Sequence, residues 1–301
     1  MENVQSNDFA MEYRLRGMNP DLHKRFTNAV FALQHILSNY KLIFPEYTDH
    51  TELHSLTVID FCNRLMGDQI NRMNADEIYV LLMGCYFHDT GMGISRKDYE
   101  EFSPQIDFGD YFETHDKDDI PAIIRNFHNE YAGCFIRKYA DFFEIPSDEH
   151  LRAIVQIARG HRKTKLTDVN EYPTEMSVPG GSMICLPYLA ALIRLADEID
   201  VTAARNPIGM YDLDSFTDAH QVFEHKKHNA IRDLSVTRDE FVMMADAAAE
   251  EEIIDALRQM QVKMQKTLDQ CREAVIGRTP YVITQSMVRL QILTVPAALR
   301  P

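Results

Sequence analysis

Six residues of metal-binding type stand at five places along the chain, one for each of five predicted helices, in line with the apolar face of that helix. Each has apolar neighbours at helical spacing, so its side chain is expected to point into the interior. One histidine in such a position is most often a hydrogen-bonded core residue, but six buried groups are costly unless a cation compensates them. Imidazole and carboxylate ligands together suit Zn²⁺, Mn²⁺ or Fe, and a carboxylate can bridge two ions. The predicted metal ligands are His54, His88, Asp89, His128, His161 and Asp197.

Basic residues lie close to these positions and are predicted to bind phosphate. Arg162 and Lys163 come directly after a predicted ligand, and Arg194 and Arg205 lie on the helix that carries the last one. Arg194, one turn before that ligand, is the predicted phosphate clamp and is assigned a catalytic role. The alternative is that Arg194 holds the last ligand, or the glutamate after it, in place.

Two further residues near the predicted ligands each have two interpretations. His50 stands four residues before His54, so both can lie on one helical face. The favoured prediction makes His50 a loop or first-turn residue that hydrogen-bonds nearby backbone. The alternative makes it a proton-transfer group or a support for the ligands. Glu130 is predicted to be an ordinary helix carboxylate, and its alternative is again a supporting role beside the ligands.

The composition limits the classes of protein to which the chain can belong. With 45% apolar and 26% charged residues, its 301 residues can bury a sizeable core and remain soluble. The formal charge of −15 argues against a broad nucleic-acid surface, although a local basic pocket can still bind a small phosphorylated substrate. The longest apolar stretch, residues 78–87, is too short to span a membrane. Five scattered cysteines without a CxxC pair, and no signal peptide, predict a reduced cytoplasmic protein.

The elements that must position these residues are mainly helices. Apolar residues recur with helical periodicity over most of the first 205 residues, which predicts a mainly α fold. A helix capped by Thr48 or Asp49 is expected to run to about residue 66. Two polar segments, 94–119 and 164–182, are predicted loops, and the first is a candidate lid over the site. The other predicted helices cover residues 21–38, 76–88, 121–143, 147–159 and 183–204.

The last third of the chain has a different pattern, which predicts a small α+β appendage. Strands are expected over 230–236 and 240–245, a helix over 250–275 and a strand over 281–293. We therefore divide the chain into a helical domain, 1–205, and a β-β-α-β appendage, 206–301, packed on it. The apolar face of the helix over 250–275 is predicted to pack on the chain's own strands, and the alternative is a seam between two copies in a homodimer.

The ordered set of ligands resembles the HD superfamily of metal-dependent phosphohydrolases, in its six-ligand, two-metal version. The resemblance covers roughly residues 45–205 and implies an HD-type helical bundle. In that family pattern His54, His88, Asp89 and Asp197 hold the first metal, and Asp89 bridges to a second. His128 and His161 complete the second site, while some members work with one ion. The strings that carry the resemblance are HSLTV, YFHDTGMG, FHNEYAG, IARGHRKT and LIRLADEID.

The resemblance implies hydrolysis of a phosphoester by metal-activated water, with His88 and Asp89 in catalytic roles and Mn, Fe, Mg, Ni or Zn as one or two bound ions. The substrate class it implies is a nucleotide or nucleotide-like compound. Met92 and Arg162 replace a lysine and a histidine of the cyclic-di-nucleotide phosphodiesterase branch, so that substrate is not implied. Two alternatives remain: an HD-fold di-iron oxygenase, and a non-catalytic metal-dependent nucleotide sensor. The run FPEYTDHTELHS is also similar to a bacterial subgroup often joined to a chaperone-type ATPase module, which makes such an ATPase a candidate partner.

Overall fold

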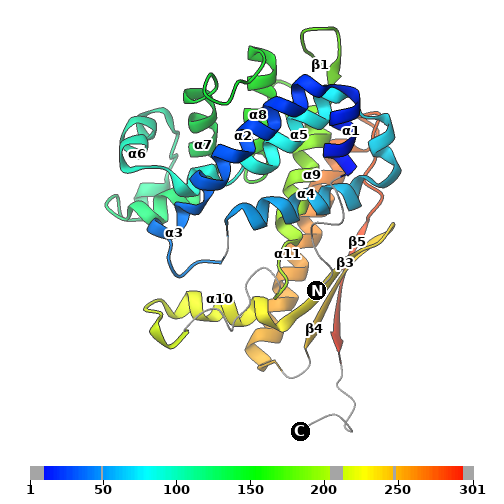
Figure 1. Ribbon diagram of the computed structural model, residues 1–301. Helices are drawn as coiled ribbons and strands as arrows, with labels where there is room; N and C mark the ends of the chain where they lie inside the picture. The colour runs from blue at the N-terminus through cyan, green and yellow to red at the C-terminus, as the bar shows by residue number, and fades with distance from the viewer. Residues whose placement is uncertain (1–9, 49, 204–212, 247–248, 294–301) are drawn as a thin grey trace.

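The protein is a bundle of helices with a smaller sheet-bearing part below it in the view of Figure 1. The computed structural model describes residues 10–48, 50–203, 213–246 and 249–293. The mainly α fold with a C-terminal α+β part is therefore confirmed. The helices of the bundle are α1 (Ala10–Met18), α2 (Pro20–Ser38), α3 (Tyr40–Ile43), α4 (Glu52–Met66), α5 (Ala75–Phe87), α6 (Arg96–Phe102), α7 (Ile120–Lys138), α8 (Asp148–Gly160) and α9 (Leu186–Ile199).

Helix α5 is the buried centre of the bundle. A capping box starts it: the Asn74 side chain accepts from the Glu77 amide, and the Glu77 carboxylate accepts from the Asn74 amide. Every residue of α5 from Glu77 to its end is buried. The chain then turns sharply after Asp89, and a Cβ at Gly91 would stand only 2.0 Å from the carbonyl oxygen of His128. Glycine at this position therefore lets the turn after α5 approach α7 closely.

Helices α7, α8 and α9 differ in detail from their predicted ranges. Helix α7 ends at Lys138 rather than 143 and has a kink at Phe127, whose φ and ψ of −120° and 16° are not helical. Helix α8 begins after its N-cap Ser147, as predicted. Helix α9 begins three residues later than predicted, because β2 (Met183–Ile184) pairs antiparallel with β1 (Met176–Ser177) in the polar segment before it.

The segment over 94–119 is less irregular than predicted. It contains α6 and two short 3₁₀ turns, Ser103–Gln105 and Tyr111–Glu113. The Lys138 ammonium and the Tyr139 hydroxyl both donate to Asp98, at 2.8 and 3.0 Å, which joins α6 to the end of α7. The first half of the segment is thus fixed against the bundle.

The C-terminal part consists of α10 (Ala219–Ala230), β3 (Ile231–Val236), β4 (Glu240–Asp246), α11 (Glu251–Val275) and β5 (Met287–Leu293). Strands β3 and β4 are antiparallel, β4 and β5 are parallel, and α11 connects β4 to β5. The predicted strand over 281–293 starts too early, because the Tyr281 hydroxyl donates to Glu77 and Gln69 bonds the backbone of Val282. Helix α10 was not predicted.

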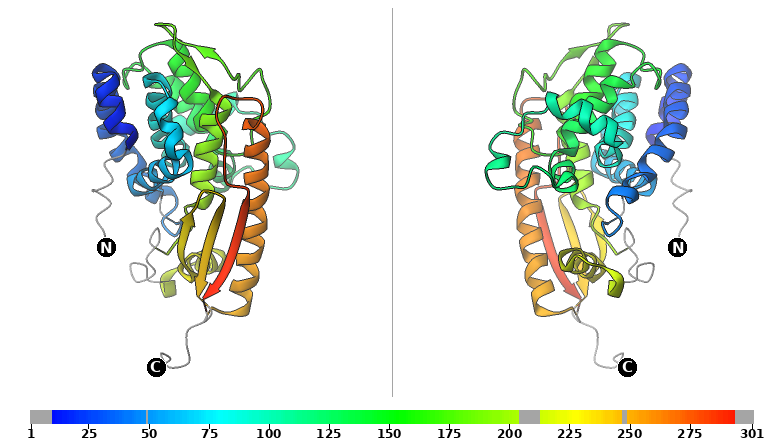
Figure 2. Two further views of the ribbon diagram at one scale, coloured as in Figure 1. Left: turned by 90° about the vertical axis from the view of Figure 1, so that its right-hand side faces the viewer. Right: turned by 90° about the vertical axis from the view of Figure 1, so that its left-hand side faces the viewer.

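Helix α11 joins the C-terminal part to the bundle. It packs along α9 and against β5, which the two views of Figure 2 show from opposite sides. Its buried residues, Leu257, Met264 and Leu268 among them, belong to the same apolar cluster as the core of the bundle. The predicted packing of its apolar face on the chain's own strands is confirmed for β5, and the same helix packs more extensively on α9. Among the described helices, none is long and apolar enough to cross a membrane.

Candidate metal centre

The structure brings all six predicted metal ligands together at one place, between α4, α5, α7, α8 and α9. The imidazole Nε2 atoms of His54 and His88 lie 3.1 Å apart, and that of His54 lies 3.2 Å from Oδ1 of Asp197. The Nε2 atoms of His128 and His161 lie 2.9 Å apart. Five of the six residues are buried, whereas the side chain of Asp197 is 26% exposed and marks the side on which the cluster opens.

Asp89 lies between the two groups of histidines with one carboxylate oxygen toward each. Its Oδ2 is 3.4 Å from Nε2 of both His54 and His88. Its Oδ1 is 3.4 Å from Nε2 of His128 and 4.0 Å from Nε2 of His161. The geometry is that of a carboxylate able to bridge two cations, with His54, His88 and Asp197 around one position and His128 and His161 around the other.

The hydrogen bonds of the four histidines fix which ring nitrogen faces the cluster. Each Nδ1 lies within hydrogen-bond distance of an oxygen that can only accept, so in His54, His88 and His161 the Nδ1 carries the proton of the neutral ring. Nδ1 of His128 also lies 3.2 Å from Nη1 of Arg162, which can only donate, so its two neighbours favour opposite tautomers. For His54 the acceptor is Oδ2 of Asp200, at 2.7 Å. For the other three it is the carbonyl oxygen three residues earlier: Cys85 (2.8 Å) for His88, Arg125 (2.9 Å) for His128 and Ala158 (2.6 Å) for His161.

Local chain structure explains this shared arrangement. His88 and His161 are the C-cap residues of α5 and α8, where the last carbonyl groups lack partners within the helix. His128 follows the kink at Phe127, which leaves the Arg125 carbonyl to its ring. In all three helices the end or the kink therefore falls next to the histidine, where a free backbone carbonyl can orient the ring.

A divalent metal fits this arrangement. With Nδ1 protonated in His54, His88 and His161, the Nε2 lone pairs of these rings face the two carboxylates, which is unfavourable without a cation. Burial lowers the pKa of His161 to about 3 and holds the pKa of His128 well below its ordinary value, so protons on these two rings do not supply that charge near neutral pH. Ligand atoms about 2.1 Å from one ion lie about 3.0–3.4 Å from one another, close to most of the separations in the cluster.

Asp200 is a site residue that the sequence analysis missed. It is buried, follows the end of α9 and accepts a hydrogen bond from Nδ1 of His54. A carboxylate in this position orients the imidazole and raises the basicity of its other nitrogen. The LIRLADEID string could have indicated it, because Asp200 is the last residue of that string, three positions after Asp197.

His50 lies in the loop before α4, as the favoured prediction has it, but its ring also contacts the cluster. The ring is buried, and its Nδ1 lies 2.7 Å from Oδ2 of Asp89, the carboxylate between the two halves of the cluster. Together with His54 and Asp89 it forms a third group of atoms close enough to hold an ion. This contact is the one that the alternative, a supporting role beside the ligands, requires, and the role itself stays a prediction.

We expect His50→Ala to lower the affinity for the ion beside His54 by about 10–100-fold, because Asp89 loses the hydrogen bond that orients it. Titration of chelator-treated protein with Mn²⁺, followed calorimetrically, measures this change. His35→Ala, which removes an exposed histidine from the last turn of α2, is the control. Equal affinity in wild type and His50→Ala would contradict the supporting role.

Glu130 holds the two helices that carry His128 and His161 against each other. Its carboxylate accepts from Nε and Nη2 of Arg159 on α8, at 2.8 and 3.1 Å. A two-point Arg–carboxylate pair fixes orientation as well as distance. The supporting role therefore acts through the helices rather than through contact with a ligand ring.

The basic residues predicted to bind phosphate differ in what they contact. Arg162 donates through Nη1 to the carbonyl of Arg125. Nδ1 of His128 lies within hydrogen-bond distance of the same carbonyl, so Arg162 stands directly beside the cluster. The Lys163 ammonium donates to the backbone and side-chain oxygens of Asn126, at 2.8 and 2.7 Å. Arg205 lies outside the described residues. Phosphate binding by these residues stays a prediction.

Arg194 points to the turn after α8. Its Nε donates to the carbonyl of Gly160 at 2.7 Å, and its Nη2 donates to the carbonyl and hydroxyl of Thr164 at 2.8 and 3.1 Å. These partners differ from those of the alternative prediction, in which Arg194 held Asp197 or Glu198. Because His161 lies between Gly160 and Thr164, Arg194 supports a ligand-bearing turn. Because Nε and Nη2 have these partners, the predicted role as phosphate clamp would have to use Nη1.

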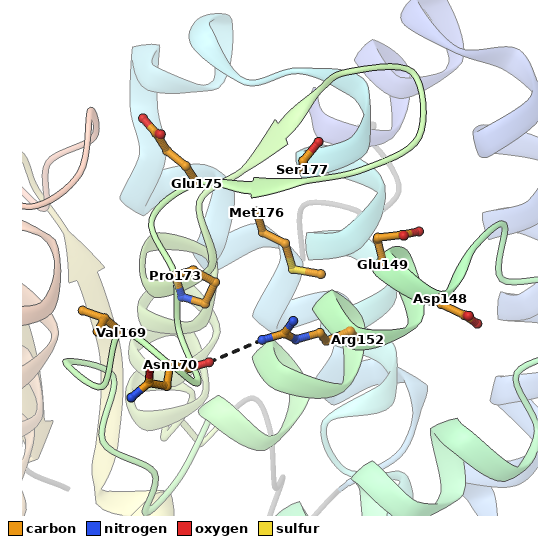
Figure 3. A pocket seen from close by; sticks show the side chains of 9 residues that line it. All are labelled: Asp148, Glu149, Arg152, Val169, Asn170, Pro173, Glu175, Met176 and Ser177. Carbon is orange, nitrogen blue, oxygen red and sulfur yellow. Dashed lines mark hydrogen bonds between the residues drawn. The ribbon is translucent and has the colours of Figure 1, made fainter.

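A cavity of about 620 Å³ opens over the cluster. Asp89, His128, His161 and Asp197 line its floor, and its wall comes partly from the bundle and partly from α10 and α11. A second groove, of about 540 Å³, lies between the start of α8 and the β1–β2 segment, and Figure 3 shows the residues around it. Arg152 in that groove donates to the Asn170 carbonyl, and none of the six predicted ligands lines it. The cavity over the cluster is therefore the candidate substrate site.

Comparison with known proteins agrees with this geometry. No curated protein and no solved structure matches the chain. The family model described as HD-CE matches residues 44–275, which is more than half of the chain and includes all six predicted ligands, Asp200 and α11. The chain therefore belongs to the HD-CE family and contains an HD-type domain whose buried histidine–aspartate cluster can hold divalent metal.

Proposed function

We propose that this protein is a metal-dependent phosphohydrolase that cleaves a phosphoester of a nucleotide or nucleotide-like substrate. The observation that carries the proposal is the position of the His/Asp cluster at the floor of a cavity lined by basic side chains, including Arg125, Arg162 and Lys163. In a chain with a formal charge of −15, basic residues gathered at one cavity favour an anionic substrate.

One or two divalent ions in the cluster would polarise a phosphoryl oxygen and lower the pKa of a water so that it can attack at neutral pH. The chain contributes orientation: the Nδ1 hydrogen bonds hold the four imidazoles with Nε2 inward before any substrate arrives. Arg162, beside His128, can offset the negative charge of the phosphoryl group. Its guanidinium is largely buried, where such an electrostatic effect is less screened.

Turnover of a panel of nucleotides and simple phosphate esters, after reloading with Mn²⁺, Fe²⁺, Mg²⁺ or Ni²⁺, tests this function. The expected result is release of phosphate or nucleoside monophosphate from at least one substrate, and its loss in the double variant His88→Ala/Asp89→Ala. His115→Ala, which changes an exposed histidine, is the control.

Two other results would contradict the proposal in favour of its alternatives. Oxygen consumption by the iron-loaded protein, without hydrolysis, would make it a di-iron oxygenase. Tight nucleotide binding without turnover with any of the metals would make it a sensor. Activity that survives in His88→Ala/Asp89→Ala would place the reaction elsewhere in the chain.

A further inference from the structure

The wall of the cavity opposite the ligand-bearing helices comes from the C-terminal part of the chain. Helix α10 contributes Phe223, Glu224 and Lys227, and α11 contributes residues spread over four turns, from Ala256 to Gln270. Figure 1 shows α11 running alongside α9, which carries Asp197. The space over the cluster is therefore bounded by both the bundle and the C-terminal part.

Two lysines on this wall are held in place by carboxylates. The Lys263 ammonium on α11 lies 2.9 Å from Oε1 of Glu198. Glu198 directly follows Asp197, so this pair fixes a positive charge at the rim of the cluster. On α10 the Lys227 ammonium lies 2.6 and 2.7 Å from the two carboxylate oxygens of Glu224. An ammonium has three N–H donors, so each lysine can bind an anionic ligand as well as its carboxylate.

More basic residues line the cavity than one phosphate group requires. The two lysines of the α10–α11 wall add to the basic residues of the bundle side, and four acidic residues face them. Two of those acids, Asp89 and Asp197, are predicted metal ligands whose charge the metal would offset. The basic residues that line the cavity are Arg125, Arg162, Lys163, Arg194, Lys227 and Lys263, and the acidic ones are Asp89, Asp197, Glu198 and Glu224.

We propose that the α10–α11 wall determines specificity: Lys263 and Lys227 bind a second phosphate group of a substrate whose first phosphate lies at the metal cluster. Phe223 and Met260, both partly buried on this wall, provide an apolar surface for the rest of the substrate. This inference rests on the proposed function and narrows its substrate to nucleotides with at least two phosphate groups. The bundle supplies the reacting groups, and the C-terminal part selects the compound.

Calorimetric binding to the metal-loaded full chain tests the inference without turnover. The probes are analogues of GTP and ATP with imido bridges at both the α,β and the β,γ positions, compared with GMP and AMP. In the wild type at least one triphosphate analogue should bind more tightly than its monophosphate. Lys263→Gln should reduce this preference about tenfold, because it removes one charge-assisted hydrogen bond.

Lys266→Gln is the matched control, because it makes the same change of charge on an exposed residue of α11 that does not line the cavity. The inference requires Lys266→Gln to keep the wild-type preference. It is overturned if the wild type shows no preference for a triphosphate, or if Lys263→Gln and Lys266→Gln reduce it equally. If the protein hydrolyses no phosphate ester but shows the Lys263-dependent preference, the proposed reaction is refuted and the role of the α10–α11 wall in binding is still supported.

Discussion

Asp89→Asn is expected to remove both metal ions and to lower turnover by roughly a thousandfold or more. Asparagine keeps the shape of the side chain but removes the negative charge that lies between the two groups of histidines. Because both positions share this carboxylate, one substitution should affect both. We expect the affinity for each ion to fall by at least about 100-fold, more than the loss of a supporting residue causes. Elemental analysis after dialysis, with turnover of the best substrate, measures both effects.

Asp98→Asn is the matched control for this substitution. Asp98 is also a mostly buried aspartate, but its partners are Lys138 and Tyr139, away from the cluster. Metal content should therefore stay at the wild-type level in Asp98→Asn. Loss of only one ion in Asp89→Asn would show that Asp89 does not bridge, and no loss would show that it is not a ligand.

Metal loading is expected to raise the melting temperature of the chelator-treated protein by about 5–10 °C. Without a cation the inward Nε2 lone pairs and two carboxylates repel one another, and this repulsion is absent from the unfolded chain. An ion present at about 1,000 times its Kd would add about 4 kcal/mol to the free energy of unfolding. For a chain of this size that corresponds to a shift of several degrees.

Thermal unfolding with increasing Mn²⁺ or Zn²⁺ measures this stabilisation. The shift should follow metal concentration and be nearly absent in Asp89→Asn. An equal shift in that variant would mean that the ions bind elsewhere. No shift in the wild type would mean that the six residues form a polar core that is stable without metal.

Apolar periodicity was sufficient to predict that the candidate ligands on helices, or at their ends, would point into one place. His54, His128 and Asp197 share a face with apolar residues, and the helices that bear them were placed to within a few residues. The periodicity shows which side of a helix is inward, and inward side chains of neighbouring helices meet. It could not show which nitrogen of each ring faces inward, because that depends on the kink at Phe127 and on the helix ends.

The residues that were missed or misassigned lie where periodicity carries no information. His50 precedes α4 and Asp200 follows α9, so neither belongs to a helical face. The direction of Arg194 was predicted from its distance along the chain to Asp197, but its hydrogen bonds go to the turn after α8. Only tertiary packing decides whether Arg194 bonds Asp197 or the turn after α8.

Helix α10 shows the same limit for a whole element. Its sequence, AHQVFEHKKHNA, has few apolar residues and no clear apolar face, so the apolar pattern gives little indication of a helix. Its start is fixed by contacts with distant chain: Thr217 and Asp218 bond the Glu46 carboxylate, and the His225 ring bonds the Glu46 carbonyl. The division of the chain at residue 205 also stays a prediction, since the HD-CE match runs across it and α11 packs along α9.

The number of metal ions bound by wild type and by His128→Ala/His161→Ala tests the central claim most directly. Elemental analysis after saturation with Mn²⁺ and removal of free metal gives this number for each folded protein. The structure predicts about two equivalents for the wild type and one for the double variant, which keeps His54, His88, Asp89 and Asp197. No bound metal in the wild type would contradict the account, and two equivalents in the double variant would contradict the assignment of His128 and His161.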